Sequence, residues 1–250
     1  MLTHAARVVL TGGADSLPGL AALLRHEGLG VLERPLLSFA PPSDWSALDG
    51  ALHARDQYHA LAVTSPRSAQ AVLQRVDWLR LAPETLPPVW TGPASVAALA
   101  TRFPFVRQPD PECPTPTSLG VQLATAMIEA GVASPVLFPC GDHHRDELID
   151  LLGARGVRAE PVICYRTLLA SIGQAFRAIS QADLLVVTSP RVAALLAAVP
   201  LTASRPALVA LGPTTARTAA RSGWTPDAIA DRPTPSEVLG AILPLLSGVR

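Results

Sequence analysis

The sequence contains no lysine and no asparagine, so all 20 of its Lys/Arg-type cations are arginines. Catalysis through a lysine Schiff base and a phosphate-binding loop that depends on lysine are both excluded. An anionic ligand must therefore be held by arginine, by hydroxyl groups or by backbone N–H groups.

The sequence also lacks a charge excess, a long apolar run and a cysteine framework. Its 20 arginines balance 20 acidic residues, which argues against nucleic acid as a partner because a phosphate backbone needs a basic surface. No apolar run reaches the roughly 18 residues of a membrane span, and the N-terminus shows no signal-peptide pattern. We therefore expect a cytoplasmic protein. Cys113, Cys140 and Cys164 show no CxxC spacing, which disfavours disulfides and a zinc site.

His143 and His144 lie close to Cys140 and Asp142, and all four side chains are of types that bind metals. Adjacent side chains diverge at the start of a helix, however, so they do not readily converge on one ion. A polar helix start is the favoured interpretation, and we expect no metal.

A repeated motif organises the chain. Val63–Arg67 and Val187–Arg191 both read Val-Thr-Ser-Pro-Arg and lie 124 residues apart, while Gly92–Ser95 and Gly212–Thr215 lie 120 apart. Ordered matches with a slowly drifting offset indicate an internal duplication. Two further matches agree with it: Leu23-Leu24 with Leu151-Leu152, and Thr115-Pro116 with Thr234-Pro235.

Short apolar runs alternate with amphipathic stretches throughout. Strands are expected at 7–11, 30–37, 60–64, 88–91, 104–107, 135–139, 157–166, 183–188, 207–211 and 227–230. Helices are expected at 17–27, 66–76, 93–102, 116–130, 144–155, 190–198, 213–222 and 235–246. Apolar strands in this alternation predict a doubly wound α/β fold in two copies, with parallel sheets covered on both faces.

The repeated motifs follow strands and begin helices, which is where ligands bind in such folds. Proline in the first helical turn loses no hydrogen bond, and hydroxyls beside free N–H groups suit an anion. Simple helix capping is the alternative for each of these residues. The candidate binding residues are Thr11, Thr64, Ser65, Gly92, Ser95, Thr188, Ser189, Gly212, Thr214 and Thr215.

Tyr165 is one of only two tyrosines and ends the apolar run at 157–166. Its phenol is a candidate proton donor, although a tyrosine at an interface with its hydroxyl in water fits the pattern equally well.

Several segments resemble the uroporphyrinogen-III synthase family. They are Leu61–Arg67, Val162–Thr167, Val187–Arg191, Leu211–Ala216 and Pro233–Pro235. The resemblance covers almost the whole chain. It implies two flavodoxin-like domains joined by a two-stranded β-ladder, with the active site in the cleft between them. Residues 1–36 with 168–250 would form one domain, and residues 37–167 the other.

The resemblance also implies an activity. The family takes the linear tetrapyrrole hydroxymethylbilane, removes its terminal hydroxyl as water, and closes the ring with the last pyrrole inverted, without a metal or organic cofactor. The product is uroporphyrinogen III. Acetate and propionate groups on the substrate suit repeated helix N-termini, and Tyr165 is the leading candidate for the catalytic proton donor. We expect a monomer.

Two positions depart from the family's pattern. The family often has arginine where this chain has Gly12 and Cys140. If those arginines hold substrate carboxylates, then Arg67, Arg145, Arg191 or backbone groups must replace them here.

Two other functions compete with this enzyme. A non-catalytic two-lobed sensor of a small anionic metabolite would share the fold and the anion-binding turns. It has no evident reason to combine Gly212–Thr215 with Tyr165. A dinucleotide-dependent enzyme is disfavoured because Thr11-Gly12-Gly13 lacks the third glycine of that fingerprint.

Overall fold

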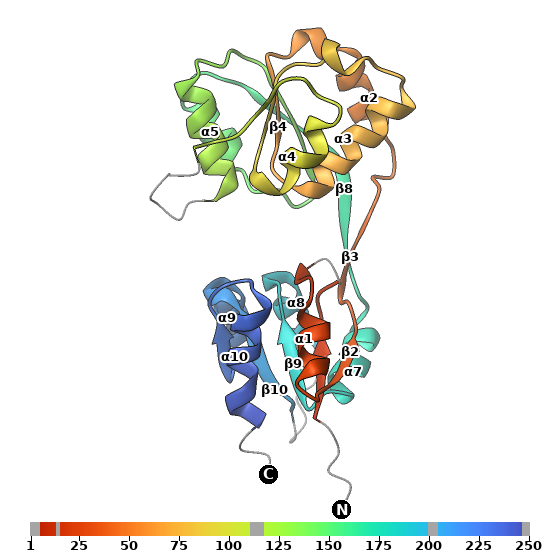
Figure 1. Cartoon of the computed structure of the whole chain (residues 1–250), viewed down its shortest axis with the longest axis vertical. Helices are drawn as coiled ribbons and strands as arrows, with labels where there is room; N and C mark the ends of the chain where they lie inside the picture. The colour runs from red at the N-terminus through yellow and green to blue at the C-terminus, as the bar shows by residue number, and fades with distance from the viewer. Residues whose placement is uncertain (1–5, 14–15, 111–117, 200–204, 247–250) are drawn as a thin grey trace, which may run out of the picture. The chain divides into compact units, whose positions relative to one another are not determined.

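The computed structural model describes residues 6–13, 16–110, 118–199 and 205–246. The chain divides into two compact units (Figure 1). Unit 1 combines residues 1–38 with 168–250, and unit 2 consists of residues 39–167. The predicted repeat residues Thr115-Pro116, and Cys113, lie outside the described residues.

Unit 1 contains a parallel sheet of the doubly wound type. Its strand order is β2 (Gly30–Glu33), β1 (Arg7–Leu10), β9 (Leu184–Val187), β10 (Ala207–Leu211) and β11 (Ala228–Ala230). Each neighbouring pair is parallel. Helices pack on both faces, so β9 is buried along its whole length, as the continuous apolar run predicts.

Two buried clusters separate the helices of unit 1 by face. One cluster joins the sheet to α1 (Leu20–His26) and α10 (Pro235–Leu246). The other joins it to α7 (Ile172–Ser180), α8 (Pro190–Leu195), the 3₁₀ turn η4 (Leu196–Ala198) and α9 (Gly212–Arg221).

Unit 2 repeats this architecture with one additional strand. Its strand order is β3 (Leu37–Ala40), β8 (Ala159–Leu169), β7 (Val136–Gly141), β4 (Ala60–Val63), β5 (Val89–Thr91) and β6 (Val106–Arg107). The pairs from β8 to β6 are parallel. One face packs on α2 (Ser46–His53), α3 (Pro66–Trp78) and α4 (Pro93–Ala100); the other packs on α5 (Leu119–Glu129) and α6 (Glu147–Gly153). Short 3₁₀ turns are η2 (Arg55–Gln57) and η3 (Pro83–Thr85).

The two sheets have the same order once their strands are matched. In unit 1, β1 has β2 on one side and the three strands β9, β10 and β11 on the other side. In unit 2, β7 likewise has β8 on one side and β4, β5 and β6 on the other side. This matches β1 with β7, β2 with β8, and β9, β10 and β11 with β4, β5 and β6. It is the flavodoxin-like order, and it confirms the predicted α/β fold with parallel sheets. The topological switch point, which is the place where the strand order reverses, lies between β1 and β9 in unit 1 and between β7 and β4 in unit 2.

One predicted strand was wrong, and two helices were not predicted. The run 30–37 forms two strands, because β2 ends at Glu33 and β3 begins at Leu37, with Pro35 between them. Helices α2 and α7 were not predicted. Ser171 and Gln174 form a capping box at the start of α7, and Asp49 on α2 accepts two hydrogen bonds from Arg75 of α3 at 2.7 and 2.6 Å.

Candidate functional site

Each unit has a cavity at its switch point, where doubly wound folds bind ligands. The unit-1 cavity has a volume of about 240 Å³ and is lined by Gly12, Gly13 and Ser16 after β1, and by Thr188 after β9. The unit-2 cavity has a volume of about 190 Å³ and is lined by Gly141 at the end of β7 and by Thr64 after β4. The threonines of the two repeated motifs therefore occupy equivalent places.

Two of the predicted site residues come together in the unit-2 cavity. Tyr165 of β8 and Thr64 both line it, although 101 positions separate them in the sequence. The Tyr165 ring lies against the backbone of Gly141, where a Cβ atom would stand 2.5 Å from ring carbons. Glycine at position 141 is therefore needed for Tyr165 to lie where it does.

A register shift in the sheet helps to aim Tyr165. Cys140 pairs with Ile163, but the next residue, Gly141, pairs with Tyr165, so Cys164 is an extra residue in β8. Such a bulge redirects the side chains that follow it. The backbone is fixed further by Asp142, whose N–H donates to the Tyr165 carbonyl at 3.1 Å and whose carboxylate accepts from Thr167 N–H at 2.9 Å.

The polar rim of the unit-2 cavity includes residues that the sequence did not single out as binding groups. His144 Nδ1 lies 3.0 Å from the Gly141 carbonyl oxygen. His144 Nε2 lies 3.4 Å from Asp146 Oδ1. Ser118 Oγ donates to Glu147 and accepts from Val121 N–H at 3.3 Å, so it caps α5 at the same time.

These polar groups do not form a metal centre. Within residues 6–13, 16–110, 118–199 and 205–246, no group of three or more His, Cys, Asp or Glu side chains is arranged to hold an ion. Burial raises the pKa of the Cys140 thiol to about 12 and that of Cys164 to about 11. Both thiols are therefore protonated near pH 7, which disfavours a role as a thiolate nucleophile or an anionic ligand.

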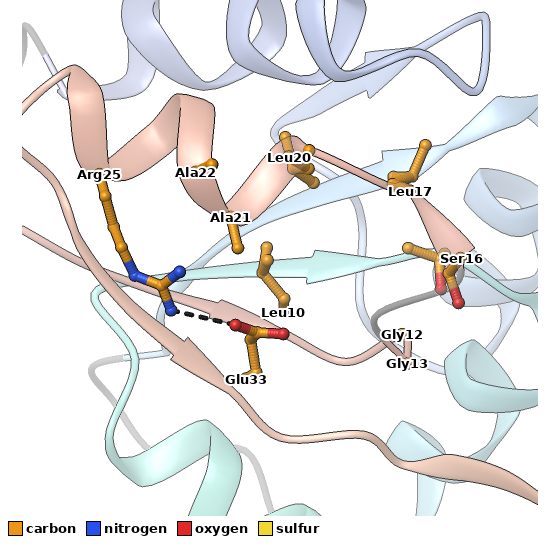
Figure 2. A pocket seen from close by; sticks show the side chains of 12 residues that line it. Leu10, Gly12, Gly13, Ser16, Leu17, Leu20, Ala21, Ala22, Arg25 and Glu33 are labelled. Carbon is orange, nitrogen blue, oxygen red and sulfur yellow. Dashed lines mark hydrogen bonds and ion pairs between the residues drawn. The ribbon is translucent and has the colours of Figure 1, made fainter.

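The unit-1 cavity contains a different set of groups. Arg25 of α1 and Glu33 of β2 form an ion pair at one side of it, which Figure 2 marks with a dashed line. Arg25 Nη2 lies 3.0 Å from Glu33 Oε1. Gly12 brings the loop close to Thr188, because a Cβ atom at position 12 would stand 2.8 Å from Thr188 Oγ1. No tyrosine, histidine or cysteine lies among the described residues of this lining.

The serines of the repeated motifs cap their helices. Ser65 Oγ accepts from Ser68 N–H at 3.1 Å, and Ser189 Oγ accepts from Arg191 N–H at 3.2 Å. Capping is therefore present at both serines, and a hydroxyl that accepts one bond still has a proton to donate.

Thr11 lies beside the switch point, but its side chain is fully buried. Its Oγ1 donates to the Val186 carbonyl at 2.8 Å, which ties the end of β1 to β9. In unit 2, Thr91 Oγ1 donates to the Val63 carbonyl at 2.8 Å in the same manner. Both hydroxyls are engaged within the sheet.

The remaining predicted residues lie at the turns after β5 and β10 and do not line the cavities described above. Gly92 is buried against Leu119, and Ser95 is 3% exposed. Gly212 has a φ of +77°, a conformation that favours glycine, and thereby starts α9. Thr214 is exposed, whereas Thr215 is 3% exposed.

Comparison with known proteins identifies the family. The family model described as uroporphyrinogen-III synthase HemD matches residues 19–240. The chain belongs to the uroporphyrinogen-III synthase family. A uroporphyrinogen-III synthase of Synechococcus elongatus is 36% identical over 69 residues, which span 28% of this chain and 26% of that relative.

Solved structures agree on the fold. A mutant uroporphyrinogen III synthase from the extremely thermophilic bacterium Thermus thermophilus has a TM-score of 0.61 at 16% identity, covering 97% of this chain and 100% of the other. A uroporphyrinogen-III synthetase from Helicobacter pylori has a TM-score of 0.59 at 16% identity, covering 98% and 100%. Within the part of the chain that the structure describes, no helix is long and apolar enough to cross a membrane.

Proposed function

We propose that this protein converts hydroxymethylbilane to uroporphyrinogen III, with loss of water and inversion of the terminal pyrrole ring, in tetrapyrrole biosynthesis. Membership of the family carries this proposal. The fold supports it, because a threonine of each duplicated turn lines a cavity at the switch point of its own sheet.

Loss of the substrate's hydroxyl as water requires a proton, and we assign the donor to Tyr165. The other tyrosine, Tyr58, is unsuited because its hydroxyl donates to Glu160 at 2.8 Å, and burial together with that carboxylate raises its pKa to about 12. Tyr165 instead lines the unit-2 cavity beside Thr64. Its phenol is therefore the tyrosine hydroxyl available to a ligand there.

The substrate's carboxylates are held, in this proposal, by hydroxyl and backbone groups at the strand-to-helix turns of both units. Thr64 and Thr188 are half-buried and follow the carboxyl ends of buried strands, where helix N-termini favour negative charge. Catalysis then depends mainly on positioning, because the bilane also closes without an enzyme, into the non-inverted isomer.

We further propose that the protein acts in the cytoplasm as a monomer, needs no metal or organic cofactor, and does not act on nucleic acid. The zero net charge supports the last point. We also propose that residues 1–36 with 168–250 and residues 37–167 are its functional domains. The sensor alternative is not favoured, because the family match is to an enzyme family.

The deciding experiment supplies hydroxymethylbilane to the purified protein and separates the type I and type III isomers of uroporphyrinogen. A reaction without protein gives the background of type I. We expect type III to predominate and to increase with protein concentration. Type I alone, formed at the background rate, would overturn the proposal and would favour a binding protein instead.

A further inference from the structure

A third cavity in unit 2 shares Tyr165 with the cavity that Thr64 lines. We call it the aromatic pocket; its volume is about 240 Å³. Phe39 of β3, Trp45 before α2 and Tyr165 supply its aromatic walls, and Tyr165 lines both this pocket and the unit-2 cavity. The Phe39 and Tyr165 rings meet edge to face, with centroids 5.9 Å apart. A ligand in the pocket would therefore contact Tyr165 directly.

Arg67 gives the aromatic pocket an uncompensated positive charge. Its guanidinium carbon lies 3.5 Å from the centre of the Phe39 ring, so the group stacks on that ring. Within the described residues, no carboxylate oxygen lies within 4.0 Å of it, and the pocket lining contains no acidic side chain. A stacked guanidinium keeps its N–H edge free for a planar anion.

A second arginine on the same helix, in contrast, has an acidic partner. Arg75, eight positions later on α3, donates to both carboxylate oxygens of Asp49 at 2.7 and 2.6 Å. The lack of an acidic partner at Arg67 is therefore not a general property of this helix.

The other two cavities differ from the aromatic pocket in the same respect. Arg25 in the unit-1 cavity lies 3.0 Å from Glu33, and Arg145 in the unit-2 cavity lies 3.9 Å from Glu147. Each of those cations already has an anion beside it. Among these three cavities, the aromatic pocket is the one whose arginine has no carboxylate beside it within the described residues.

Two amides extend the polar side of the pocket. Gln70 and Gln74 follow Arg67 at spacings of three and seven residues, which places all three on one face of α3. Both glutamines are exposed and can donate or accept hydrogen bonds. The pocket thus combines aromatic walls with a cation and two amides.

We infer that the aromatic pocket binds a planar aromatic ring that carries a carboxylate, with the size of a single carboxylated pyrrole. The ring would contact Trp45 and Phe39, and the carboxylate would accept a bidentate pair of hydrogen bonds from Arg67. Pockets for drug-sized ligands occupy about 300–1,000 Å³, so a volume of about 240 Å³ suits a smaller group, such as one ring. The ring is either one ring of the tetrapyrrole, an assignment that rests on the proposed function, or a separate monopyrrole.

Binding of pyrrole-2-carboxylate to the full-length protein tests the inference without any tetrapyrrole. Isothermal titration to about 10 mM covers the affinity expected of a ligand with so few non-hydrogen atoms. We expect Arg67→Gln to weaken binding about tenfold or more through loss of a charge-assisted pair. The matched control is Arg107→Gln, because Arg107 also lies over an aromatic ring, 5.4 Å from the centre of Trp90, but outside the pocket.

Two further measurements locate the ligand. Pyrrole-2-carboxamide, which keeps the ring and lacks the charge, should bind wild type and Arg67→Gln equally weakly. Tryptophan fluorescence should be quenched by pyrrole-2-carboxylate in wild type and in Trp78→Phe, but not in Trp45→Phe, since Trp78 lies outside the pocket lining. Circular dichroism establishes that each variant is folded.

Absence of saturable binding by wild type, equal affinity of wild type and Arg67→Gln, or equal affinity for carboxylate and carboxamide would each overturn the inference. An inhibition assay then identifies the source of the ring. Competition with hydroxymethylbilane assigns the pocket to a ring of the substrate, whereas binding that leaves KM unchanged assigns it to a separate monopyrrole. Either outcome supports the site, and the binding assay stands even if the cyclisation assay fails.

Discussion

The two Val-Thr-Ser-Pro-Arg turns share one sequence and one place in their sheets, but they have different neighbours. Thr64 in unit 2 shares its cavity with Tyr165 and His144. Thr188 in unit 1 shares its cavity with Gly12, Gly13 and a closed Arg25–Glu33 pair. The two units thus share the hydroxyl-bearing turn, while among the described lining residues a tyrosine and a histidine occur in the unit-2 cavity alone.

The arginines of the two motifs show the same divergence. Arg67 stacks on Phe39 at a pocket wall, whereas Arg191 has a buried Nη1 atom without a hydrogen-bond partner among the described residues. The helices differ as well, since α3 has 13 residues and α8 has 6. We propose that both units hold substrate carboxylates and that unit 2 supplies the proton.

The largest effect is expected from Tyr165→Phe. Removing a general acid lowers kcat by about 10²–10⁴-fold, and KM should change little because the ring remains. Tyr58→Phe is the matched control, and it should keep near-wild-type kcat while losing the hydrogen bond to Glu160. Steady-state kinetics of both variants make the comparison. Near-normal kcat in Tyr165→Phe would show that Tyr165 is not the proton donor.

Gly141→Ala should have the next largest effect. A Cβ atom 2.5 Å from the Tyr165 ring must displace it, and misplacement by about 1 Å can reduce rate about 10²-fold. Gly153→Ala on α6 is the control, because a Cβ atom there meets nothing within 4 Å. Both variants are assayed for kcat/KM. If the two behave alike, the position of Tyr165 is not what limits the rate.

Thr64→Val and Thr188→Val should each lower kcat/KM about tenfold, the loss expected when one hydrogen bond to a charged group is removed. Single substitutions of Ser65, Ser95, Ser189 or Thr214 should reduce activity without abolishing it, and at Ser95, which is 3% exposed, the effect should come through the packing of its turn. Thr101→Val, an exposed threonine in unit 2, is the control. If a folded variant at any one turn kept less than about a thousandth of wild-type activity, substrate binding would not be shared among several turns.

Thr11→Val and Thr91→Val should have the smallest effect on activity and a matched effect on stability. Each removes a buried hydroxyl that donates to a neighbouring strand at 2.8 Å. We expect the free energy of unfolding to fall by about 1–2 kcal/mol in both, measured by urea denaturation. A loss of stability in only one variant would show that the two sheets do not share this device.

Much of the fold could be predicted because parallel strands buried on both faces appear as short apolar runs. Strand β10 and helix α10 have the predicted bounds. Helix α2 was not predicted; its Asp49 pairs with Arg75, which lies 26 positions later in the sequence. A contact between residues so far apart in the sequence leaves no pattern in the sequence around α2.

The candidate site could be predicted only in part. Thr64 and Tyr165 were singled out separately, and the adjacency of β4, β7 and β8 brings them to one cavity. His144 was interpreted as part of a polar helix start, although it lines that cavity. The stacking of Arg67 on Phe39 joins residues on different elements, so sequence spacing carries no sign of it.

The most direct test of the central claim is the isomer ratio formed by the double variant Thr64→Val/Thr188→Val, measured beside wild type. We propose that these turns shape the substrate and that Tyr165 transfers the proton. The double variant should therefore still consume hydroxymethylbilane faster than the spontaneous reaction but release a larger fraction of type I product. If the type III fraction stays unchanged whatever the rate of consumption, the turns do not shape the substrate.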